Sequence, residues 1–245
     1  IDWNKSDHKI SGLLMGLFLG DGCSQAGNNS HRDSFINNSK ELRSLFVEGV
    51  EKLGDKVSFY SSNPTQGYIT KKTRSKHPTN FAKELKRLGL YEKKSWEKFI
   101  PSSYITANYQ TRKELIEGLV LTDGCVSGHK VEIYSNSRKM LEGISTVLMS
   151  FGIVGKIYER KPRGENHRTQ YIINFPYSKC SIFNFRFKDK NGPNSRAYKF
   201  SSLRVKSVTK VGKKSVRCIT VDHPSHLFIL GNGLVTANSG KTHTA

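Results

Sequence analysis

A ten-residue pattern occurs twice in this chain, and this repeat constrains the fold more than any other feature of the sequence. Residues 14–23 run LMGLFLGDGC, and residues 116–125 run IEGLVLTDGC. Each copy precedes a short strand-like run ending in Asn-Ser and a helical pattern that ends at Gly54 or Gly152, where glycine is typical of a helix C-terminus. The repeat predicts two copies of one structural unit in a single chain.

Alternating apolar and polar residues after each copy predict strands, and apolar residues at helical spacing predict helices. The predicted strands are 35–39, 57–61 and 68–72 in the first half and 131–137, 156–160 and 169–175 in the second. The predicted helices that follow the motifs are 42–53 and 140–151. The chain is therefore expected to belong to the α+β class, with two similar halves.

The charge balance indicates a polyanionic partner. The chain has 40 Lys and Arg residues against 20 Asp and Glu, a formal net charge of +20, and nucleic acid is the first candidate. Basic residues gather on and beside predicted strands at matching places in both halves, which favours DNA contact over an ordinary solvated face. These residues are Lys71, Lys72, Arg74, Lys76, Arg160, Lys161, Arg163 and Arg168. A membrane partner is not expected, because no apolar run approaches the ~20 residues that span a bilayer.

Small residues recur every four positions on the predicted motif helices. Gly12, Gly16 and Gly20 form one stripe, and Gly118 and Thr122 occupy the matching stripe in the second copy. A glycine costs a helix roughly 1 kcal/mol against alanine. A stripe of such residues therefore indicates that two helix backbones approach closely.

Side-by-side packing of the two motif helices would bring Asp21 and Asp123 together at the helix C-terminal ends. Two carboxylates there repel each other and the negative ends of the helix dipoles. The arrangement becomes favourable when a cation is bound, and Mg2+ prefers one or two carboxylates together with phosphate oxygens and water. The sequence therefore predicts a site for Mg2+ or another divalent cation, made by both halves.

Residues 10–200 resemble the LAGLIDADG homing endonucleases in their single-chain, two-repeat form, because both Asp-Gly motifs recur with the same strand and helix pattern behind them. The resemblance implies two pseudo-symmetric αββαββα repeats, a central pair of motif helices and two sheets that form a saddle over double-stranded DNA. It implies a site-specific DNA endonuclease in which Asp21 and Asp123 bind the divalent ions. The carbonyl groups of Gly20 and Thr122 are the further ligands that it suggests.

The family also keeps a basic residue beside each metal site. Lys98, just before the second motif, looks like that lysine, against the plain alternative of a surface lysine beside Pro101. A shift of 98 residues leads from Lys98 to Arg196 in the second half, where the lysine is replaced. The replacement puts the relative rates of the two strand cuts in doubt.

The four cysteines, Cys23, Cys125, Cys180 and Cys218, form no CxxC pair, so the sequence shows no zinc-site pattern. Cys23 and Cys125 follow the two Asp-Gly pairs and are expected to pack as small apolar residues rather than to form a disulfide. The expected location is the reducing cytoplasm of a bacterial, archaeal or phage-infected cell.

The pattern changes after about residue 200. Two strand-like runs, 203–208 and 215–221, precede apolar segments that flank Asn232 and Gly233. An Asn-Gly pair between apolar runs is typical of a tight hairpin. This part of the chain is therefore predicted to be a small all-β unit.

Residues 203–239 resemble the C-terminal splicing region of inteins, with a strand, a His-x-Phe, a hairpin and then Asn followed by Ser. The resemblance implies that Asn238 cyclises onto its own carbonyl and that Ser239 is the nucleophile in transesterification. It implies that His226 acts as a general acid or base or holds Asn238. Cys218 falls where many inteins have a functional Asp or Cys, and a buried strand cysteine is the alternative.

Two departures from the intein pattern bear on activity. Ala237 stands before the terminal asparagine, where inteins usually have His, and no N-terminal splicing block is present. Splicing is therefore expected only with an N-terminal intein fragment as partner. The Gly-Lys-Thr that follows Ser239 matches the end of a phosphate-binding loop, which suggests an ATPase host, such as a helicase.

These patterns predict three segments. Residues 1–200 are expected to form the endonuclease, with repeats at about 8–105 and 106–200, residues 201–238 the splicing segment and residues 239–245 the host remnant. The expected DNA partner is the intein-free host gene, and the expected state is a monomer because the repeat supplies the symmetry. The alternative is an inactive nuclease relic that binds DNA or only supports protein splicing.

Overall fold

The computed structural model describes most of residues 8–185 and short stretches beyond them. The described residues are 8–25, 32–73, 77–127, 129–162, 164, 168–185, 207–210, 212–213, 215, 219–222, 224–229 and 235–237. The chain forms two compact units, Ile1–Ala197 and Tyr198–Ala245.

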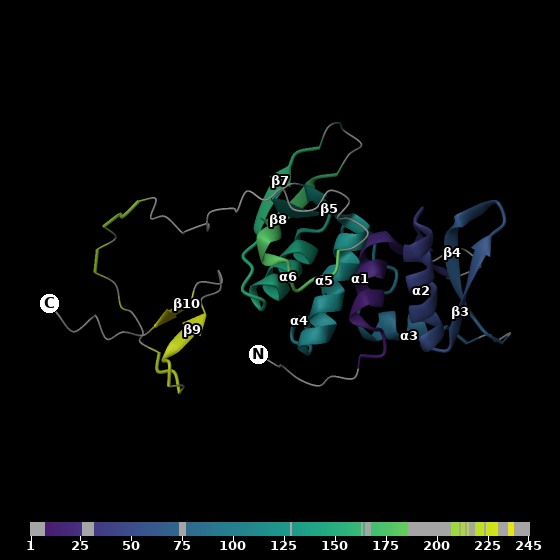
Figure 1. Cartoon of the computed structure of the whole chain (residues 1–245), viewed down its shortest axis with the longest axis horizontal. Helices are drawn as coiled ribbons and strands as arrows, with labels where there is room; N and C mark the ends of the chain where they lie inside the picture. Colours follow the sequence, from purple (N-terminus) through teal and green to yellow (C-terminus); the bar gives the residue numbers. More distant parts are fainter. Residues whose placement is uncertain are drawn as a thin grey trace. The chain divides into compact units, whose positions relative to one another are not determined.

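The first half of the larger unit has the αββαββα order that the family resemblance implies (Figure 1). Its elements are α1 (Gly12–Asp21), β1 (Gly22–Gln25), β2 (Arg32–Ile36), α2 (Lys40–Lys52), β3 (Asp55–Tyr60), β4 (Asn63–Lys71) and α3 (Asn80–Arg87). The strands pair antiparallel in the order β1-β2-β4-β3. β4 begins at Asn63, before the predicted start at residue 68.

The second half repeats this arrangement. Its elements are α4 (Ser102–Ile105), α5 (Tyr109–Asp123), β5 (Gly124–Ser127), β6 (Lys130–Ser135), α6 (Arg138–Met149), β7 (Lys156–Arg160), β8 (Gln170–Pro176) and a 3-10 turn (Tyr177–Lys179). The antiparallel order β5-β6-β8-β7 matches that of the first sheet. The last helix of the predicted second repeat falls beyond residue 185 and lies outside the described residues. Two antiparallel sheets with packed helices confirm the predicted α+β class.

Side-chain caps decide where the longer helices begin. At five helix starts, a polar side chain accepts a hydrogen bond from a backbone N–H group three residues further on, which has no partner inside the helix. The capping residues are Ser11, Ser39, Thr79, Asn108 and Ser137. Gly54 and Gly152 follow α2 and α6 with φ values of 81° and 74°, as the sequence predicts for helix C-termini.

The strands before α2 and α6 end earlier than the sequence predicts. β2 ends at Ile36 rather than residue 39, and β6 ends at Ser135 rather than residue 137. Ser39 and Ser137 cap the helices instead. The predicted strand ends were therefore wrong, because satisfying the free N–H groups of a helix outweighs one more strand residue.

α1 is buried around its whole circumference. Its buried apolar residues are Leu14, Met15, Leu17, Phe18 and Leu19, each at most 2% exposed. A helix that is apolar on all sides is stable only inside a protein. α1 packs against α5, α2 and the first sheet, and its contact with α5 is the most extensive between any two elements.

The small residues of α1 and α5 form this contact, and the predicted close approach of the two backbones is confirmed. A Cβ atom added to Gly118 would lie 2.6 Å from the Leu13 carbonyl oxygen and 2.8 Å from the Leu17 nitrogen. One added to Gly16 would lie 2.9 Å from the Gly118 Cα atom. All three distances are shorter than real Cβ contacts, so any side chain here would push the helices apart.

The smaller unit contains an antiparallel hairpin of β9 (Leu227–Ile229) and β10 (Val235–Ala237). This confirms the hairpin that the sequence predicts around Asn232 and Gly233, although these two residues lie outside the described part. The described residues of the predicted strands 203–208 and 215–221 lie in no strand. Val208 there is 92% exposed, so alternation in this segment buries no apolar face and gives no packing gain.

Within the described residues, no helix combines the length and the apolar character that crossing a membrane requires.

Alanine at the helix contact provides a test with a matched control. Gly118→Ala is expected to lower the free energy of unfolding by about 1–3 kcal/mol or more, because the added methyl meets backbone. Gly49→Ala in α2 is expected to be near neutral or stabilising, since its methyl would meet only Leu14 side-chain atoms at 3.1 Å and alanine favours helix by roughly 1 kcal/mol. Urea unfolding followed by circular dichroism measures both, and equal effects would contradict the close approach.

Candidate functional site

The two motif aspartates end the two paired helices. Asp21 is the last residue of α1, and Asp123 is the last residue of α5. Gly20 packs directly against the Thr122 side chain, so that a methyl group on Gly20 would overlap it. The two helix ends therefore meet, and the structure brings both aspartates to one place. Both carboxylates also act on the same ammonium group, that of Lys98.

Asn37 orients the first of these carboxylates. Its Nδ2 atom donates to Asp21 Oδ2 at 2.5 Å, and its Oδ1 atom accepts from the backbone N–H of Ser39 at 2.7 Å. The Asn37 side chain is thus fixed from both ends by the turn between β2 and α2. In the other helix, the Thr122 hydroxyl donates to the Gly118 carbonyl at 2.9 Å, which fixes the Thr122 side chain against its own helix.

Lys98 enters the site from the segment that links the two halves. The residue is only 6% exposed, and its Nζ atom donates to the carbonyl oxygens of Phe18, Leu19 and Gly22 at 3.2, 2.9 and 2.7 Å. These carbonyls include groups that the end of α1 leaves without a helical partner. The plain alternative, a surface lysine, is therefore wrong, because three carbonyl oxygens hold the ammonium group inside the protein.

The electrostatics of Lys98 follow from this position. Burial lowers the pKa of its amine to about 8, because the charged form loses water, and the nearby Asp123 and Asp21 carboxylates act in the opposite direction. A positive charge at a helix C-terminus is also stabilised by the helix dipole. The lysine therefore offsets part of the negative charge that two carboxylates and two helix ends concentrate here.

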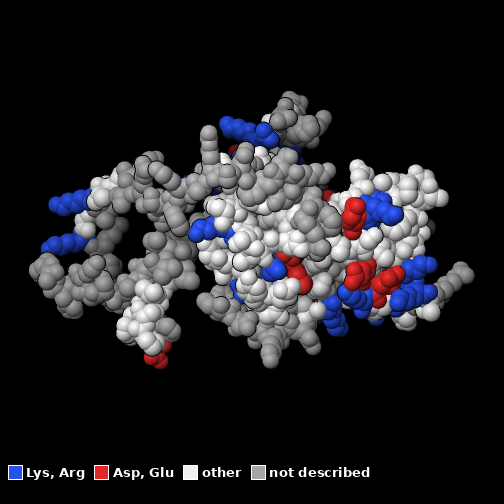
Figure 2. Space-filling view, viewed as in Figure 1, with Lys and Arg blue, Asp and Glu red and all other residues white. Residues whose placement is uncertain are grey.

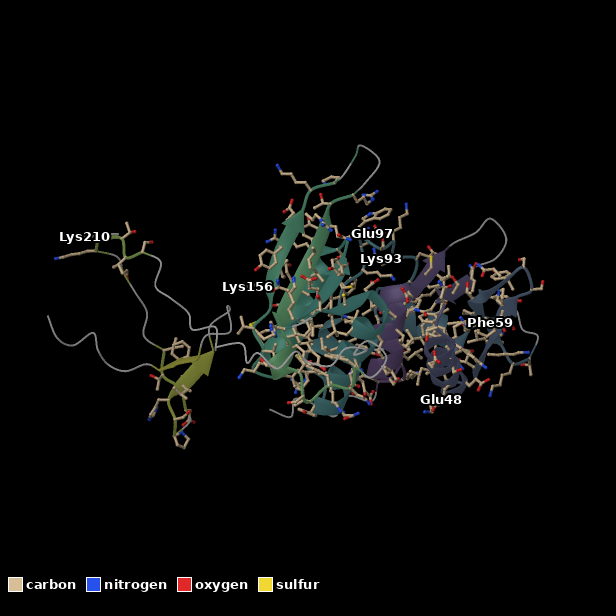
Figure 3. The ribbon with its side chains drawn as sticks, turned by 45° about the horizontal axis from the view of Figure 1, so that its top comes forward. Glu48, Phe59, Lys93, Glu97, Lys156 and Lys210 are labelled. Carbon is tan, nitrogen blue, oxygen red and sulfur yellow. The ribbon has the colours of Figure 1, made fainter. Side chains whose placement is uncertain are left out.

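The linker between α3 and α4, residues 88–101, is hydrogen-bonded to both halves of the unit. The Lys98 carbonyl accepts from the Ser137 hydroxyl at 2.6 Å, which ties it to the start of α6. The Glu92 N–H group donates to the Ser24 hydroxyl on β1 at 3.0 Å. Figure 3 shows Lys93 and Glu97 of this linker between the two sheets. The segment that carries Lys98 is therefore held in register with both repeats.

The donor set suits a hard divalent cation. Two carboxylates and backbone carbonyl groups at two helix C-termini are all oxygen ligands, which Mg2+ and Ca2+ prefer. The described residues contain no cluster of three or more His, Cys, Asp or Glu side chains that would hold a metal alone. A cation bound between Asp21 and Asp123 would therefore complete its coordination with carbonyls, water or substrate oxygens.

Each sheet has one face packed on the helices and one open face. On β6, Val131 and Ile133 are fully buried, while the alternate residues Glu132 and Tyr134 are partly exposed. On β2, Phe35 is 2% exposed and Ile36 is 45% exposed. Because successive side chains of a strand point to opposite faces, the open faces can be assigned residue by residue.

The basic residues that the sequence singles out lie in different places. Arg160 is on the open face of β7, opposite Gln170, and Lys161 follows it at an exposed position. Lys71 pairs with the buried Asp55 at the end of the first sheet and is half-buried, and Lys72 is exposed just beyond. Arg74, Lys76, Arg163 and Arg196 lie outside the described residues.

Arg168 stacks on an aromatic ring of the linker. Its guanidinium carbon lies 3.5 Å from the centroid of the Trp96 ring, and Lys94 Nζ lies 5.3 Å from the same centroid. Cation–π stacking of this kind leaves the edges of a guanidinium group available to a phosphate. No local pattern predicts this contact, because the two residues come from different repeats.

The cysteines differ in their surroundings. Cys23, Cys125 and Cys180 are free thiols, and Cys218 lies outside the described residues. Cys23 is half-buried, but Cys125 is exposed. The expectation that Cys125 packs as a small apolar residue was therefore wrong. It lies on β5 opposite Glu132, on the open face of an edge strand where no helix covers it.

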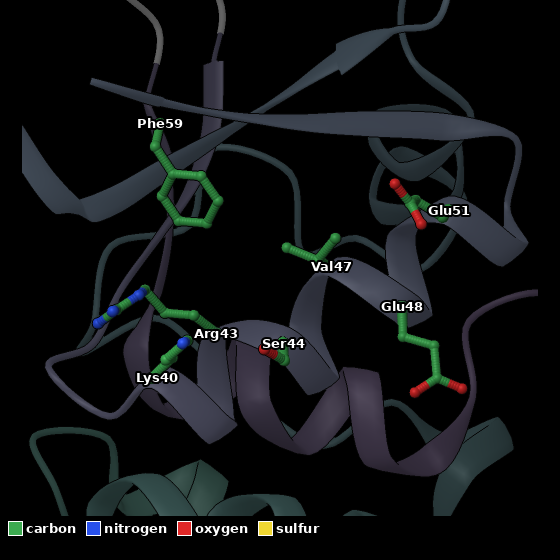
Figure 4. Close-up of a pocket in the computed structure, with 7 residues that line it drawn as sticks. All are labelled: Lys40, Arg43, Ser44, Val47, Glu48, Glu51 and Phe59. Carbon is green, nitrogen blue, oxygen red and sulfur yellow. The ribbon is translucent and has the colours of Figure 1, made fainter. Parts of the chain in front are cut away.

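A hollow of about 400 Å³ lies on the first half, between α2 and the outer part of β3 (Figure 4). Its lining residues are Lys40, Arg43, Ser44, Val47, Glu48, Glu51 and Phe59. None of them belongs to the aspartate site. The surface on this side of the unit shows basic and acidic side chains next to each other (Figure 2). On α2, Lys52 and Glu48 form an exposed ion pair at 2.7 Å. This mixed surface is less suited to a polyanion than a purely basic one.

In the smaller unit, the hairpin pairs two residues that are adjacent in sequence to predicted splicing positions. Ala237, the residue before Asn238, pairs with Leu227, the residue after His226. His226 is exposed, has a φ of 50°, and its Nδ1 atom lies 3.3 Å from the Val221 carbonyl oxygen. Asn238 and Ser239 lie outside the described residues.

The second half of the larger unit matches a known protein family model. Residues 110–216 match the model of the LAGLIDADG-like domain. The matched range begins in α5, contains Thr122 and Asp123, and continues through the second sheet. The LAGLIDADG-like match thus includes one of the two aspartates and its motif helix.

Curated relatives and solved structures are also similar to this chain. It is 26% identical over 176 residues to the replication factor C small subunit of Methanocaldococcus jannaschii, and 32% over 178 residues to a probable translation initiation factor IF-2 of the same organism. It is 25% identical over 150 residues to the replicative DNA helicase DnaB of Mycobacterium intracellulare. These matches cover 70%, 71% and 58% of this chain but only 9%, 14% and 26% of the relatives. A structure of variants of the homing endonuclease I-DmoI has a TM-score of 0.48 at 16% identity, covering 71% of this chain and 92% of that chain.

Divalent cations should stabilise the larger unit through the two aspartates. With Mg2+ at ten times its dissociation constant, the free energy of unfolding is expected to rise by about 1.4 kcal/mol. Asp123→Asn should lose this gain, because it removes one of the two carboxylates that hold the cation. Thermal unfolding measures both effects. Asp222→Asn, an exposed carboxylate of the smaller unit, serves as the control, and a Mg2+ response retained by Asp123→Asn would contradict the assignment.

Proposed function

We propose that residues 1–200 form a homing endonuclease that makes a site-specific, divalent-cation-dependent double-strand break in DNA. The observation that carries this proposal is the meeting of the two glycine-packed motif helices, which places one aspartate from each repeat beside a buried lysine. Two equivalent carboxylates in one site suit two equivalent cuts, one on each DNA strand. The match of residues 110–216 to the LAGLIDADG-like domain supports the same function.

The chain's own residues have distinct parts in this proposal. Asp21 and Asp123 hold Mg2+ with help from the carbonyls of Gly20 and Thr122. A bound divalent ion supplies an activated water and stabilises the leaving oxygen. Lys98 keeps the carbonyls at the end of α1 satisfied and places positive charge beside both carboxylates. In the second half, Arg196 is the proposed counterpart of Lys98.

The basic residues of the open faces supply phosphate contacts in the same proposal. Arg160 projects from the second sheet, and Arg168 is held by Trp96 with its guanidinium edges free of the ring plane. Lys72, Arg74, Lys76, Lys161 and Arg163 belong to the same proposed set, with Lys71 at the end of the first sheet, where it is half-buried on the same face as Val57 and Ile69. Such contacts would fix the position of the DNA without reading its sequence. A single chain would act as a monomer in a reducing cytoplasm.

Cleavage of a plasmid library that contains the intein-free host gene tests the nuclease. The native chain is expected to cut one site with Mg2+ and not with EDTA. Asp21→Asn and Asp123→Asn are each expected to lose on the order of 100-fold or more in rate, which corresponds to ~2.7 kcal/mol of transition-state stabilisation.

Glu48→Gln, at an exposed position of α2, is the control and should cut at the native rate. Selective binding without cutting by the native chain would show an inactive relic. Cutting that both aspartate variants retain would exclude the proposed site.

We further propose that residues 201–238 are the C-terminal splicing segment of an intein and that residues 239–245 come from its host. The hairpin register supports this, because it pairs the residue after His226 with the residue before Asn238. The curated relatives support it in another way. They are named as a replication factor, a translation factor and a helicase, yet each shares a similar segment that is a small part of its length. A similar segment within proteins of such different names is the pattern expected of an element inserted into unrelated host genes.

Mass spectrometry tests the splicing proposal. When the chain is mixed with an N-terminal intein fragment from the same genome, we expect release of residues 239–245 by cleavage after Asn238, because Asn cyclisation breaks that bond. Asn238→Ala should remain intact, and His226→Ala should slow the release at least about tenfold. An unchanged mass in the native mixture would contradict the proposal.

A further inference from the structure

On the open face of the second sheet, the inner strands β6 and β8 carry one acidic side chain, Glu132. Glu132 lies on β6 between Cys125 of β5 and Asn174 of β8, and Asn174 pairs in turn with Lys156 of the edge strand β7. Figure 3 shows Lys156 at the edge of this sheet. A carboxylate in this row needs an explanation, because the same face would meet the phosphates of DNA.

The first sheet has no charge at the equivalent positions. A shift of 98 residues relates the two halves, and it leads from Glu132 to Ser34 and from Tyr134 to Ile36. The registers agree, because Ser34 pairs with Cys23 on the strand that leaves the first motif, as Glu132 pairs with Cys125. The two halves therefore carry different side chains at matching places: Ser34, which is 8% exposed, and the exposed Ile36 in the first half, against Glu132 and Tyr134 in the second.

Two neighbours on the same strand hold the Glu132 carboxylate. Lys130 Nζ donates to Oε1 at 2.6 Å, and the Tyr134 hydroxyl donates to Oε2 at 2.8 Å. The Glu132 side chain is 16% exposed and that of Lys130 is 49% exposed. Each carboxylate oxygen can accept more than one hydrogen bond, so both oxygens keep acceptor capacity toward the open side. The Glu132 side chain is thus held in one orientation, and its carboxylate can still accept hydrogen bonds from a ligand.

The protonation states of this group are settled by the same contacts. The hydrogen bond from Lys130 lowers the pKa of Glu132, and the hydrogen bond to Glu132 raises the pKa of Tyr134 to about 12. At neutral pH, Glu132 is therefore an acceptor only, Tyr134 remains a donor to it, and Lys130 is a donor only.

We propose that Lys130 and Glu132 together read one C·G base pair in the major groove of the half-site under the second sheet. An ionised carboxylate repels phosphates, so its partner on DNA must be a donor on a base edge. Cytosine offers only its N4 amino group there, whereas adenine adds an N7 acceptor that a carboxylate would repel. The paired guanine offers the O6 and N7 acceptors, which suit the ammonium group of Lys130. The inference rests on the proposed DNA-cleaving function.

The position of Glu132 also predicts where the base pair lies. Its partner Cys125 is two residues beyond Asp123 along β5. With strands ~4.8 Å apart and ~3.3 Å per residue along a strand, Glu132 is on the order of 8 Å from the end of α5. At 3.4 Å per base pair, the C·G pair should lie roughly two to three base pairs from a cut strand.

Selection of bound duplexes from a randomised DNA library, in Ca2+ to retain binding, tests this inference. The native chain should select C·G at one position of one half-site, close to the centre of the whole target, and not at the pseudo-symmetric position of the other half-site. Glu132→Gln should change that preference to A·T by about tenfold or more, because an amide can donate to N7 and accept from N6 of adenine. Lys130→Met should weaken the preference at the same position.

Glu142→Gln is the matched control, because Glu142 makes an exposed ion pair with Arg138 at 3.0 Å on α6, away from the open face. It should select the native sequence, and equal thermal stability of all variants confirms that each is folded. A native selection that Glu132→Gln reproduces at every position would overturn the inference and leave the proposed nuclease intact. A native chain that selects no sequence at all would overturn both.

Discussion

The contact between the backbones of α1 and α5 is the constraint on which the rest of the larger unit depends. Gly118 lies so close to α1 that a single added carbon would meet the Leu13 carbonyl. Two helices that approach this closely fix their ends as well as their axes. The positions of Asp21 and Asp123 and of the strands that follow are therefore consequences of this one contact. Glycine weakens each helix on its own, and burial of the apolar surface around α1 offsets that loss.

The same contact concentrates negative charge. Two carboxylates and two helix C-termini meet within one site, and repulsion among them favours separation of the helices. The buried Lys98 reduces this repulsion. Its ammonium group donates hydrogen bonds to three carbonyl oxygens at the end of α1, and its positive charge attracts both carboxylates. One lysine compensates only part of this charge. The negative charge that Lys98 does not offset favours binding of a cation. The packing of the two helices thereby creates the site for the proposed chemistry.

The sequence predicted the elements well where a local pattern decided them. The repeat, the class and both sheets were visible as periodicity, and the glycines that follow α2 and α6, Gly54 and Gly152, marked where these helices stop. Strand ends were less predictable, because Ser39 could continue a strand or cap a helix. The described part of the predicted tail strands shows the limit of such patterns, since alternation at Val208 has no surface to cover. A strand needs a partner that local sequence does not specify.

The sequence by itself determined that two equivalent units exist, that their motif helices must touch, and that each contributes one aspartate to the same end. These follow from small-residue spacing and repetition, which are properties of a single segment. Only the tertiary structure decided that Lys98 is buried against α1, that Arg168 stacks on Trp96, and that Lys130 and Tyr134 hold Glu132 on an open face. The first two contacts join distant segments, and the third depends on which face of a strand the helices cover. Their geometry exists only after the chain has packed.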